Sequence, residues 1–290
     1  MIGFISPQEY FRLHGGRPRK HLGQHFLTQP KTAEKIVQAA TLAPDDVVVE
    51  VGPGLGMLTA FLLEACAAVH LVEIDPQLAD FLQEAVSGRG GTVRVHRQDI
   101  LEFDWDGAAR EAGRRLVVVG NLPYQISSPL LFRILENRHA IHHGVFMVQR
   151  EVGRRFAAEP GSGDYGVLSV LLRLYGTVRP VLSVGPGQFY PPPKVDSLVV
   201  RVDFPEERSD VEGVDFQWIR QVVNAAFQKR RKTVANSLTG FHGLGAAGVK
   251  AVLHAAGIDP TLRPEALGPE AFASLARTLK TTISSSHKAV

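Results

Sequence analysis

The stretch V-V-V-E-V-G-P-G-L-G at residues 47–56 decides the fold class of this chain of 290 residues. A run of β-branched residues is typical of a buried strand, and the closely spaced glycines behind it suit a sharp backbone turn. The residues that follow, 57–66, have the composition of a helix. The sequence therefore predicts a buried strand, a glycine loop and a helix in direct succession.

The same alternation of short apolar runs and helical stretches continues to residue 149. Strands that alternate with helices form βαβ units and a parallel sheet. Right-handed crossovers bring the carboxyl ends of such strands to one edge, where open α/β sheets bind their ligands. Strands are predicted at residues 46–52, 69–75, 93–99, 115–120 and 144–149, and helices at 57–66, 77–86 and 128–138.

The pattern changes after residue 160. Residues 167–184 and 197–204 are predicted as strands that complete the sheet, some of them antiparallel. Pro205 and the acids after it indicate a linker, and helices are predicted at residues 213–227, 246–256 and 269–280. We therefore expect a flexible N-terminal segment at 1–16, an α/β domain at 17–205, a helical domain at 206–280 and a frayed tail at 281–290.

The composition indicates a globular protein without membrane segments. Hydrophobic residues make up 44% and charged residues 21%, and no apolar run reaches the ~20 residues of a membrane-spanning helix. The N-terminal residues lack a secretory signal and Cys66 is the single cysteine, so a reducing, cytoplasmic compartment is expected. His21 and His25 flank a glycine in a loop-like segment, so no metal site is expected.

Basic residues gather in two parts of the chain, although the net charge is only +3. One cluster lies at residues 11–35 and the other at residues 229–232. If the fold brings them to one face, they could follow a phosphate backbone. The alternative is that both are ordinary solvated surfaces, and charge alone does not decide between the two.

The glycine loop differs from that of a dinucleotide-binding fold. A G-x-G-x-x-G loop would place its third glycine where this chain has Met57, whereas Gly56 comes one residue early. Glu50 stands two residues before Gly52, and a carboxylate there suits a cationic ligand better than a pyrophosphate. S-adenosylmethionine, which carries a sulfonium and an ammonium group, fits this pattern, and an NAD-dependent oxidoreductase is disfavoured. A purely structural turn is the remaining alternative.

Acidic residues end the next two predicted strands. Glu73 follows Gly52 by about twenty residues, the offset at which an acid accepts hydrogen bonds from ribose hydroxyls. Asp99 ends the third strand, where it can accept a hydrogen bond from the exocyclic amine of an adenine. Glu73 or Asp75 could instead cap the following helix. Because such features rarely coincide at three successive strand ends, we expect a nucleoside-bearing cofactor, and S-adenosylmethionine in particular.

The fourth predicted strand runs directly into N-L-P-Y at residues 121–124, so these side chains reach the same edge of the sheet. Their chemistry suits methyl transfer to an exocyclic amine, which is a poor nucleophile because its lone pair is conjugated with the ring. The Asn121 side-chain oxygen and a backbone carbonyl can accept both amine hydrogens and turn that lone pair toward a methyl group. Pro123 fixes the loop, and Tyr124 offers a face for base stacking. The alternative is a plain turn with Asn121 as a cap and Tyr124 in the core.

Six motifs together resemble the small-subunit ribosomal RNA adenine N6,N6-dimethyltransferase family over residues from about 17 to 280. They are R-K-x-L-G-Q-H-F-L at 19–27, E-V-G-P-G-L-G at 50–56, V-E-I-D at 72–75, Q-D at 98–99, N-L-P-Y at 121–124 and F-Y-P-P-P-K-V-D-S at 189–197. The resemblance implies a Rossmann-like class I methyltransferase fold with a seven-stranded, mostly parallel sheet and a small all-α C-terminal domain. It also implies dimethylation, dependent on S-adenosyl-L-methionine, of two adjacent adenosines near the 3′ end of 16S rRNA, in the 30S subunit or its precursor, by a monomeric enzyme.

The resemblance also assigns site residues. Family members often carry Asn in place of His25, so a cofactor contact through the backbone survives the change, whereas a side-chain amide contact does not. The Phe189 ring is expected beside the target base, opposite Tyr124. The implied cofactor contacts are His25, Leu27, Gly52, Gly54, Glu73, Asp99 and Asn121. The implied catalytic residues are Asn121, Leu122, Pro123, Tyr124 and Phe189, and the expected RNA-binding residues are Arg19, Lys20, Lys194, Lys229, Arg230, Arg231 and Lys232.

Two other functions stay open on the sequence. The sibling class that methylates a single 23S rRNA adenine and confers macrolide resistance shares the glycine loop and an N-x-P-Y-type motif. The F-Y-P-P-P-K-V-D-S stretch and the long helical C-terminus favour the 16S enzyme. A non-catalytic ribosome-assembly factor on the same fold would not need Glu73, Asp99 and Asn121.

Overall fold

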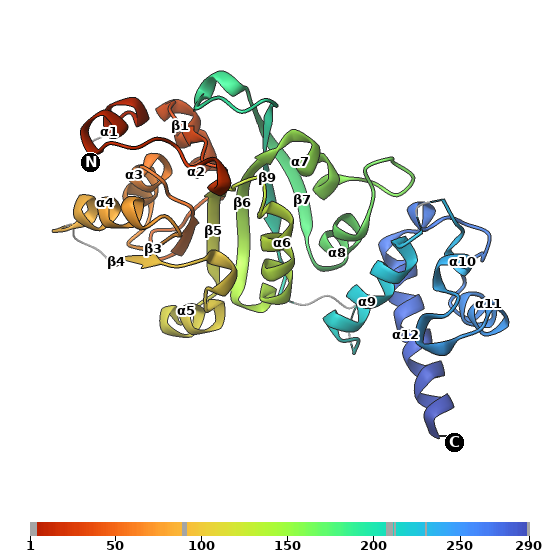
Figure 1. The fold of residues 1–290 in the computed structure, drawn as a ribbon. Coiled ribbons are helices and arrows are strands. Elements are labelled where there is room, and N and C mark those ends of the chain that lie inside the picture. Colours follow the sequence, from red (N-terminus) through yellow and green to blue (C-terminus); the bar gives the residue numbers. More distant parts are fainter. Residues whose placement is uncertain (1–4, 89–91, 207–210, 212, 230, 289–290) are drawn as a thin grey trace. The chain divides into compact units, whose positions relative to one another are not determined.

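The computed structural model of this chain describes residues 5–88, 92–206, 211, 213–229 and 231–288 (Figure 1). The chain divides into two compact units. The first comprises Met1–Gly153 and Val178–Glu206, and the second comprises Arg154–Thr177 and Glu207–Val290. Among the described residues, no helix is long and apolar enough to cross a membrane.

The first unit is built on a seven-stranded sheet in the order β4-β3-β2-β5-β6-β9-β7. Its strands are β2 (Val47–Val51), β3 (Ala68–Glu73), β4 (Thr92–Arg97), β5 (Leu116–Asn121), β6 (Ile141–Gln149), β7 (Thr177–Val184) and β9 (Ser197–Asp203). The pairs from β4 through β6 are parallel, whereas β9 runs antiparallel to β6. The predicted mostly parallel sheet is confirmed, and the carboxyl ends of β2 to β5 lie at one edge.

The helices of the first unit follow the predicted alternation. The helices predicted at 57–66, 77–86 and 128–138 are present within about two residues of those bounds. Pro30 and Pro76 begin two of the helices, where the amide hydrogen that proline lacks is not needed. The helices are α1 (Pro7–His14), α2 (Pro30–Ala40), α3 (Met57–Ala65), α4 (Pro76–Val86), α5 (Trp105–Ala112) and α6 (Ser127–Glu136), and α7 (Arg150–Ala157) spans the boundary to the second unit.

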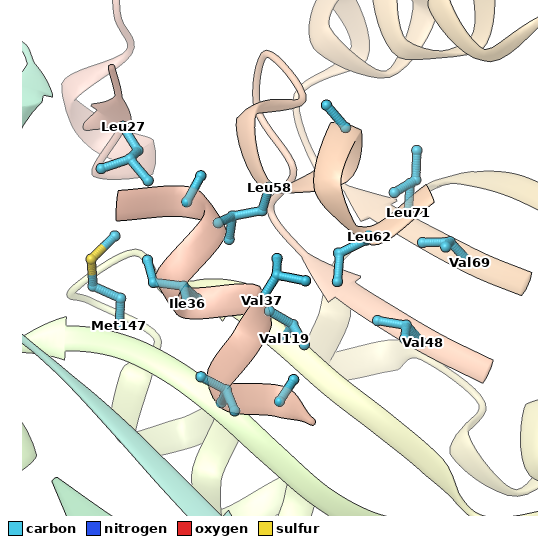
Figure 2. Packing of buried hydrophobic residues seen from close by; sticks show 14 of the residues in the cluster. Leu27, Ile36, Val37, Val48, Leu58, Leu62, Val69, Leu71, Val119 and Met147 are labelled. Carbon is cyan, nitrogen blue, oxygen red and sulfur yellow. The ribbon is translucent and has the colours of Figure 1, made fainter. Parts of the chain in front are cut away.

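One cluster of the hydrophobic core lies where helices α2 and α3 pack on the sheet (Figure 2). Ile36 from α2 and Leu62 from α3 are fully buried against Val48 of β2. All five residues of β2 are buried, so both faces of this strand are covered. Each such side chain contributes roughly 1.5–3 kcal/mol on burial, which makes the strand ends a firm base for a site.

A second, two-stranded sheet joins two of the sequence motifs. β1 (Phe26–Leu27) pairs antiparallel with β8 (Phe189–Tyr190), with Leu27 opposite Phe189. The Thr28 backbone amide extends this link by donating to the Gln188 carbonyl over 2.9 Å. The segment 19–27 is thereby attached to the segment 189–197, and the linked residues Thr28 and Gln188 are 160 positions apart in sequence.

One prediction of strand structure is wrong. Residues 167–175 form helix α8 (Val167–Tyr175), and only Thr177–Val184 forms a strand. Apolar residues occupy nearly every position of this run, so its period does not separate a buried helix from a buried strand. Gly166 and Gly176 flank the helix in extended conformations and mark its ends.

The second unit is helical. Besides α8 it contains α9 (Phe216–Phe227), α10 (Val234–Leu238), α11 (Ala246–Ala255) and α12 (Pro269–Lys288). Its boundary differs from the expected one at residue 205, because residues 154–177 group with the C-terminal helices. At the two ends of the chain, α12 continues through residues 281–288, and α1 lies within residues 1–16 with Tyr10 only 4% exposed. The flexibility expected of both segments stays a prediction.

Candidate active site

A cavity opens at the sheet edge where β2, β3, β4 and β5 end. Its walls come from the segment before α2, the glycine loop and the ends of the three neighbouring strands. The predicted cofactor residues His25, Leu27, Gly52, Gly54, Glu73, Asp99 and Asn121 all line it, together with Leu122, Pro123 and Tyr124. The fold therefore gathers most of the predicted site residues in one place.

The glycine loop leaves room at the base of the cavity. Gly54 has a φ of +59°, a conformation that L-residues rarely adopt. A Cβ at this position would come within 3.2 Å of the Phe26 ring. Both the backbone conformation and the nearby Phe26 ring therefore favour glycine at this position. In this conformation the backbone amide of Gly54 donates a hydrogen bond to the adjacent acid.

That acid is Glu73, at the end of β3. Its side chain accepts hydrogen bonds from the backbone amides of Gly54, at 3.1 Å, and of Asp75, at 2.9 Å. Glu73 is only 5% exposed, and burial raises its pKa to about 7. A carboxylate held by two amides cannot swing away, and its oxygens retain lone pairs for a ligand. Asp75, by contrast, caps α4 by accepting from the amide of Gln77, as the capping alternative predicted.

A second buried acid stands one strand away. Glu50 in β2 is 1% exposed, and the Thr59 hydroxyl donates to it over 2.6 Å. Burial, together with the neighbouring charge of Glu73, raises the pKa of Glu50 to about 8. Two buried carboxyls that resist ionisation make this end of the cavity favourable for a cation, because a positive ligand restores the charged form.

Asp99 lies half-buried at the next strand end. One of its side-chain oxygens accepts from the Leu101 amide at 2.9 Å and begins a short 3-10 turn, Ile100–Glu102. The apolar walls beside it were not predicted from the sequence. Ile74, which is 47% exposed, and Ile100 both line the cavity. The position of Ile74 between two acids in V-E-I-D was the signal that could have revealed it.

The segment before β1 is fastened over this end of the cavity. The Arg19 guanidinium contacts the Asp75 carboxylate at 3.2 Å and donates to the Gln77 side chain at 3.1 Å. Gln24 donates to the same carboxylate at 2.8 Å and accepts from the Arg19 amide at 2.7 Å. Because Asp75 is 3% exposed, this strap of Arg19 and Gln24 closes on a buried acid. Arg19, predicted as an RNA contact, is thus engaged within the chain.

Asn121 marks the opposite end of the cavity. Its side-chain nitrogen donates to the backbone carbonyl of His25 at 2.8 Å, which fixes the amide and leaves its oxygen as an acceptor. Leu122 is 1% exposed, and its amide donates to the Met147 carbonyl in β6 at 2.9 Å. The loop that carries the N-L-P-Y residues is therefore anchored to the sheet.

Tyr124 is half-buried, and its environment differs from the prediction. Its hydroxyl lies 3.2 Å from the Ser197 hydroxyl, and burial raises the pKa of the phenol. The ring next to it is that of His25, with centroids 5.5 Å apart and planes inclined by 28°. Phe189, predicted opposite Tyr124, is 5% exposed and belongs to the hydrophobic core. Its side chain turns inward because β8 pairs with β1 and directs Phe189 to the face that Leu27 occupies.

The predicted RNA-binding residues are distributed over both units. Lys20 and Lys194 of the first unit are exposed. In the second unit, the Lys229 ammonium donates to the Asn236 carbonyl at 3.2 Å, while Arg231 and Lys232 are exposed. Arg230 lies outside the described residues. Their contact with RNA stays a prediction.

Comparison with known proteins decides the family. The profile of the family described as ribosomal RNA adenine dimethylase matches residues 15–280. The chain belongs to this family. A protein of Syntrophotalea carbinolica named ribosomal RNA small subunit methyltransferase A is 46% identical to it over 265 residues, which cover 91% of this chain and 97% of that protein. A protein of the same name from Nitrosococcus oceani is 43% identical over 263 residues, covering 91% and 96%.

Solved structures of related enzymes share the fold of this family member. A dimethyladenosine transferase from Plasmodium falciparum superposes with a TM-score of 0.75 at 25% identity, covering 89% of this chain and 98% of that one. The 23S rRNA methyltransferase ErmE gives a TM-score of 0.65 at 29% identity, covering 88% and 99%. The Rossmann-like class I methyltransferase fold and the family resemblance predicted from the motifs are both confirmed.

Proposed function

We propose that this protein dimethylates the N6 amines of two adjacent adenosines near the 3′ end of 16S rRNA, with S-adenosyl-L-methionine as methyl donor. The observation that carries the proposal is a single cavity with buried acids at one end and the Asn121 amide oxygen at the other. A donor cation and an acceptor amine can therefore meet inside one site. The small-subunit names of relatives at 43% and 46% identity support the 16S over the 23S substrate.

The residues at the acidic end fit this donor. Bound S-adenosylmethionine would supply an electrophilic methyl group. Glu73, held by two backbone amides, would accept from the ribose hydroxyls, and each such charge-assisted bond is worth ~1.5–3 kcal/mol. Asp99 would accept from the adenine amine with the oxygen that does not bind Leu101. Gly52 and Gly54, which have no Cβ atoms, would leave space for the donor. The backbones of His25 and Leu27 would form the rest of the pocket wall.

At the other end, Asn121 would position the acceptor. Its nitrogen is occupied by the His25 carbonyl, so its oxygen is the atom that accepts one hydrogen of the target amine. A backbone carbonyl of the N-L-P-Y loop would accept the other hydrogen. Both bonds together turn the nitrogen lone pair out of conjugation with the ring. No strong general base is needed, because the methylated ammonium readily loses its proton, and catalysis rests on positioning and polar preorganisation.

The remaining predictions belong to the same proposal. Lys20, Lys194 and the basic residues 229–232 would contact rRNA in the 30S subunit or its precursor, where shape as well as sequence defines the target. Leu122 and Pro123 would hold the loop, and Tyr124 would stack on the base. The division into an α/β domain and a helical domain, the monomeric state and the cytoplasmic location are likewise proposed.

The direct test is incubation of the purified protein with labelled S-adenosylmethionine and unmethylated 30S particles, followed by nucleoside analysis. We expect labelled dimethyladenosine in 16S rRNA, and none in particles whose adenosines are already methylated. A parallel incubation with unmethylated 50S particles addresses the 23S alternative. Label in 23S rRNA alone, or no label from a protein that binds the donor, would overturn the proposal.

A further inference from the structure

The imidazole of His25 covers the ring of Tyr124 at the acceptor end of the cavity. The two rings are stacked at a centroid distance of 5.5 Å with an interplanar angle of 28°. The Nδ1 atom of His25 lies 2.7 Å from the Pro191 carbonyl oxygen. Because a carbonyl can only accept, Nδ1 carries the hydrogen of this bond and the ring is held in place over the tyrosine.

Tyr124 is itself fixed from the other side. Its hydroxyl meets the Ser197 hydroxyl at the start of β9, and its backbone follows the anchored Leu122. The Tyr124 and His25 rings contact each other directly, because their centroid distance of 5.5 Å lies within the range of about 4.5–7 Å for stacked aromatic pairs. A third flat ring cannot enter between them. A base can reach this face of Tyr124 only if the imidazole leaves.

We propose that the His25 side chain is an internal stand-in for the target base, which occupies the stacking face of Tyr124 and is displaced when the acceptor adenine enters. The inference rests on the proposed function and deepens it, since it makes His25 a determinant of acceptor binding as well as a backbone contact of the donor site. His25 is thereby a competitor of the base and not a partner that clamps it.

The chain separates the two tasks of His25 between its backbone and its side chain. The backbone carbonyl orients the Asn121 amide, whereas the ring contacts Tyr124 and Pro191. Departure of the ring therefore breaks one hydrogen bond and one stacking contact and leaves the Asn121 contact in place. A stacking pair is worth little enough that an incoming base, which stacks on the same face, can replace it.

The kinetic test compares His25→Ala with His25→Phe in the full chain. Removal of the ring should lower the KM for 30S particles by about 2- to 10-fold, the range that corresponds to one aromatic pair. The phenylalanine variant keeps a ring over Tyr124 and should not lower the KM. The dissociation constant for S-adenosylmethionine should change less than about twofold in both variants, because the backbone contact is kept. The control is His254→Ala, which changes an exposed histidine of α11 outside the cavity lining.

A second measurement does not depend on turnover. Adenosine 5′-monophosphate is titrated into the protein saturated with S-adenosylhomocysteine, and His25 is observed by NMR with labelled histidine side chains. We expect the His25 resonance, identified by its loss in His25→Ala, to shift on titration, and the alanine variant to bind the nucleotide more tightly.

A higher KM in His25→Ala with unchanged donor affinity would show that the ring clamps the base and would overturn the proposal. Equal nucleotide titration curves for wild type and His25→Ala, flat ones included, would overturn it as well. If wild type fails to methylate particles while the nucleotide still displaces His25, the proposed function fails and the displacement stands.

Discussion

The acidic and the N-L-P-Y ends of the cavity differ in how much of their geometry is in place without a ligand. At the acidic end, Glu73 is held by two backbone amides, and Asp99 by a third. At the N-L-P-Y end, His25 covers Tyr124 and Phe189 lies in the core. The acidic end is thus prebuilt, whereas the N-L-P-Y end is closed by the chain itself.

The difference follows from what holds each end. Strand ends of a buried sheet carry the acids, and backbone amides orient them, so no side chain has to move before a small ligand binds. The N-L-P-Y end is formed by a loop and by the segment before α2, which meet through side-chain contacts that cost little to exchange. A macromolecular substrate can supply the binding energy for that exchange, and a small donor does not need to.

The difference between the two ends of the cavity depends most on Glu73, and replacement of Glu73 has the largest expected effect on ligand binding. Glu73→Ala removes the proposed ribose acceptor and leaves the amides of Gly54 and Asp75 without their partner. We expect binding of S-adenosylmethionine to become undetectable by calorimetry, a loss of at least about a hundredfold. Glu64→Ala, which changes an exposed acid of α3, is the matched control and should bind normally. Unchanged affinity in a folded Glu73→Ala protein would refute the ribose role.

Asn121 tests the acceptor end separately. Asn121→Ala removes the oxygen proposed to orient the target amine, so the methylation rate on 30S particles should fall by about a hundredfold, as for the loss of one preorganised polar group. Donor affinity should fall far less than in Glu73→Ala. Asn224→Ala, at an exposed position of α9, serves as the control. A variant as fast as wild type would remove the amine-positioning account.

Variants of the basic residues 229–232 test whether substrate binding extends beyond the cavity. Replacement of Lys229, Arg231 and Lys232 by alanine should weaken 30S binding about tenfold and flatten its dependence on salt by ~0.7 per lost phosphate contact. Donor affinity should not change. An identical salt slope in filter binding would place this cluster off the RNA.

The pH dependence of donor binding reports on the buried acids. Burial raises the pKa of Glu73 to about 7 and that of Glu50 to about 8. A cation favours their ionised forms, so donor affinity should rise several-fold between about pH 6 and pH 8, with protons released on binding. Calorimetry in buffers of different ionisation enthalpy measures that release, and Glu50→Gln should reduce it. Equal proton release from both proteins would exclude Glu50 as its source.

Without a ligand, the same two carboxyl groups make the free energy of unfolding fall as the pH rises, whereas donor affinity rises with pH. The native carboxyls bind more protons than the unfolded ones, whose pKa is 4.5, at every pH between that value and about 8. Their contribution to the free energy of unfolding is therefore present at low pH and is lost as the pH rises through this window. Denaturant titrations of wild type and Glu50→Gln should diverge as the pH rises, with the glutamine variant losing less stability.

The smallest expected effect concerns the strap over the donor end. Arg19→Ala breaks the ion pair with the buried Asp75 carboxylate, which keeps its hydrogen bonds from the Gln24 side chain and the Gln77 amide. The dissociation constant for the donor should therefore rise only about two- to fivefold. The measurement also separates two roles of Arg19. A loss confined to 30S binding would support the RNA contact predicted from the sequence and contradict a role of the strap in donor binding.

Most of the sheet could be predicted because its strands are short apolar runs bounded by glycine or polar residues. The error at residues 167–175 arose where apolar residues fill a helix on all sides, since such a run has no period to read. Helix α1 and the pairing of β1 with β8 were not predicted, because the contacts that stabilise them join residues far apart in sequence.

The sequence by itself determined the acidic end of the cavity. Glycines that must adopt positive φ and acids that end buried strands are local features, and each strand places its last residue at the same edge. Only the tertiary structure decided the N-L-P-Y end. Whether Phe189 or His25 faces Tyr124 depends on the register of β1 against β8 and on the hydrogen bond from His25 to Pro191. The strand pairing and the hydrogen bond both join segments far apart in the chain, and His25 and Pro191 are 166 positions apart in sequence. No local sequence pattern encodes such contacts.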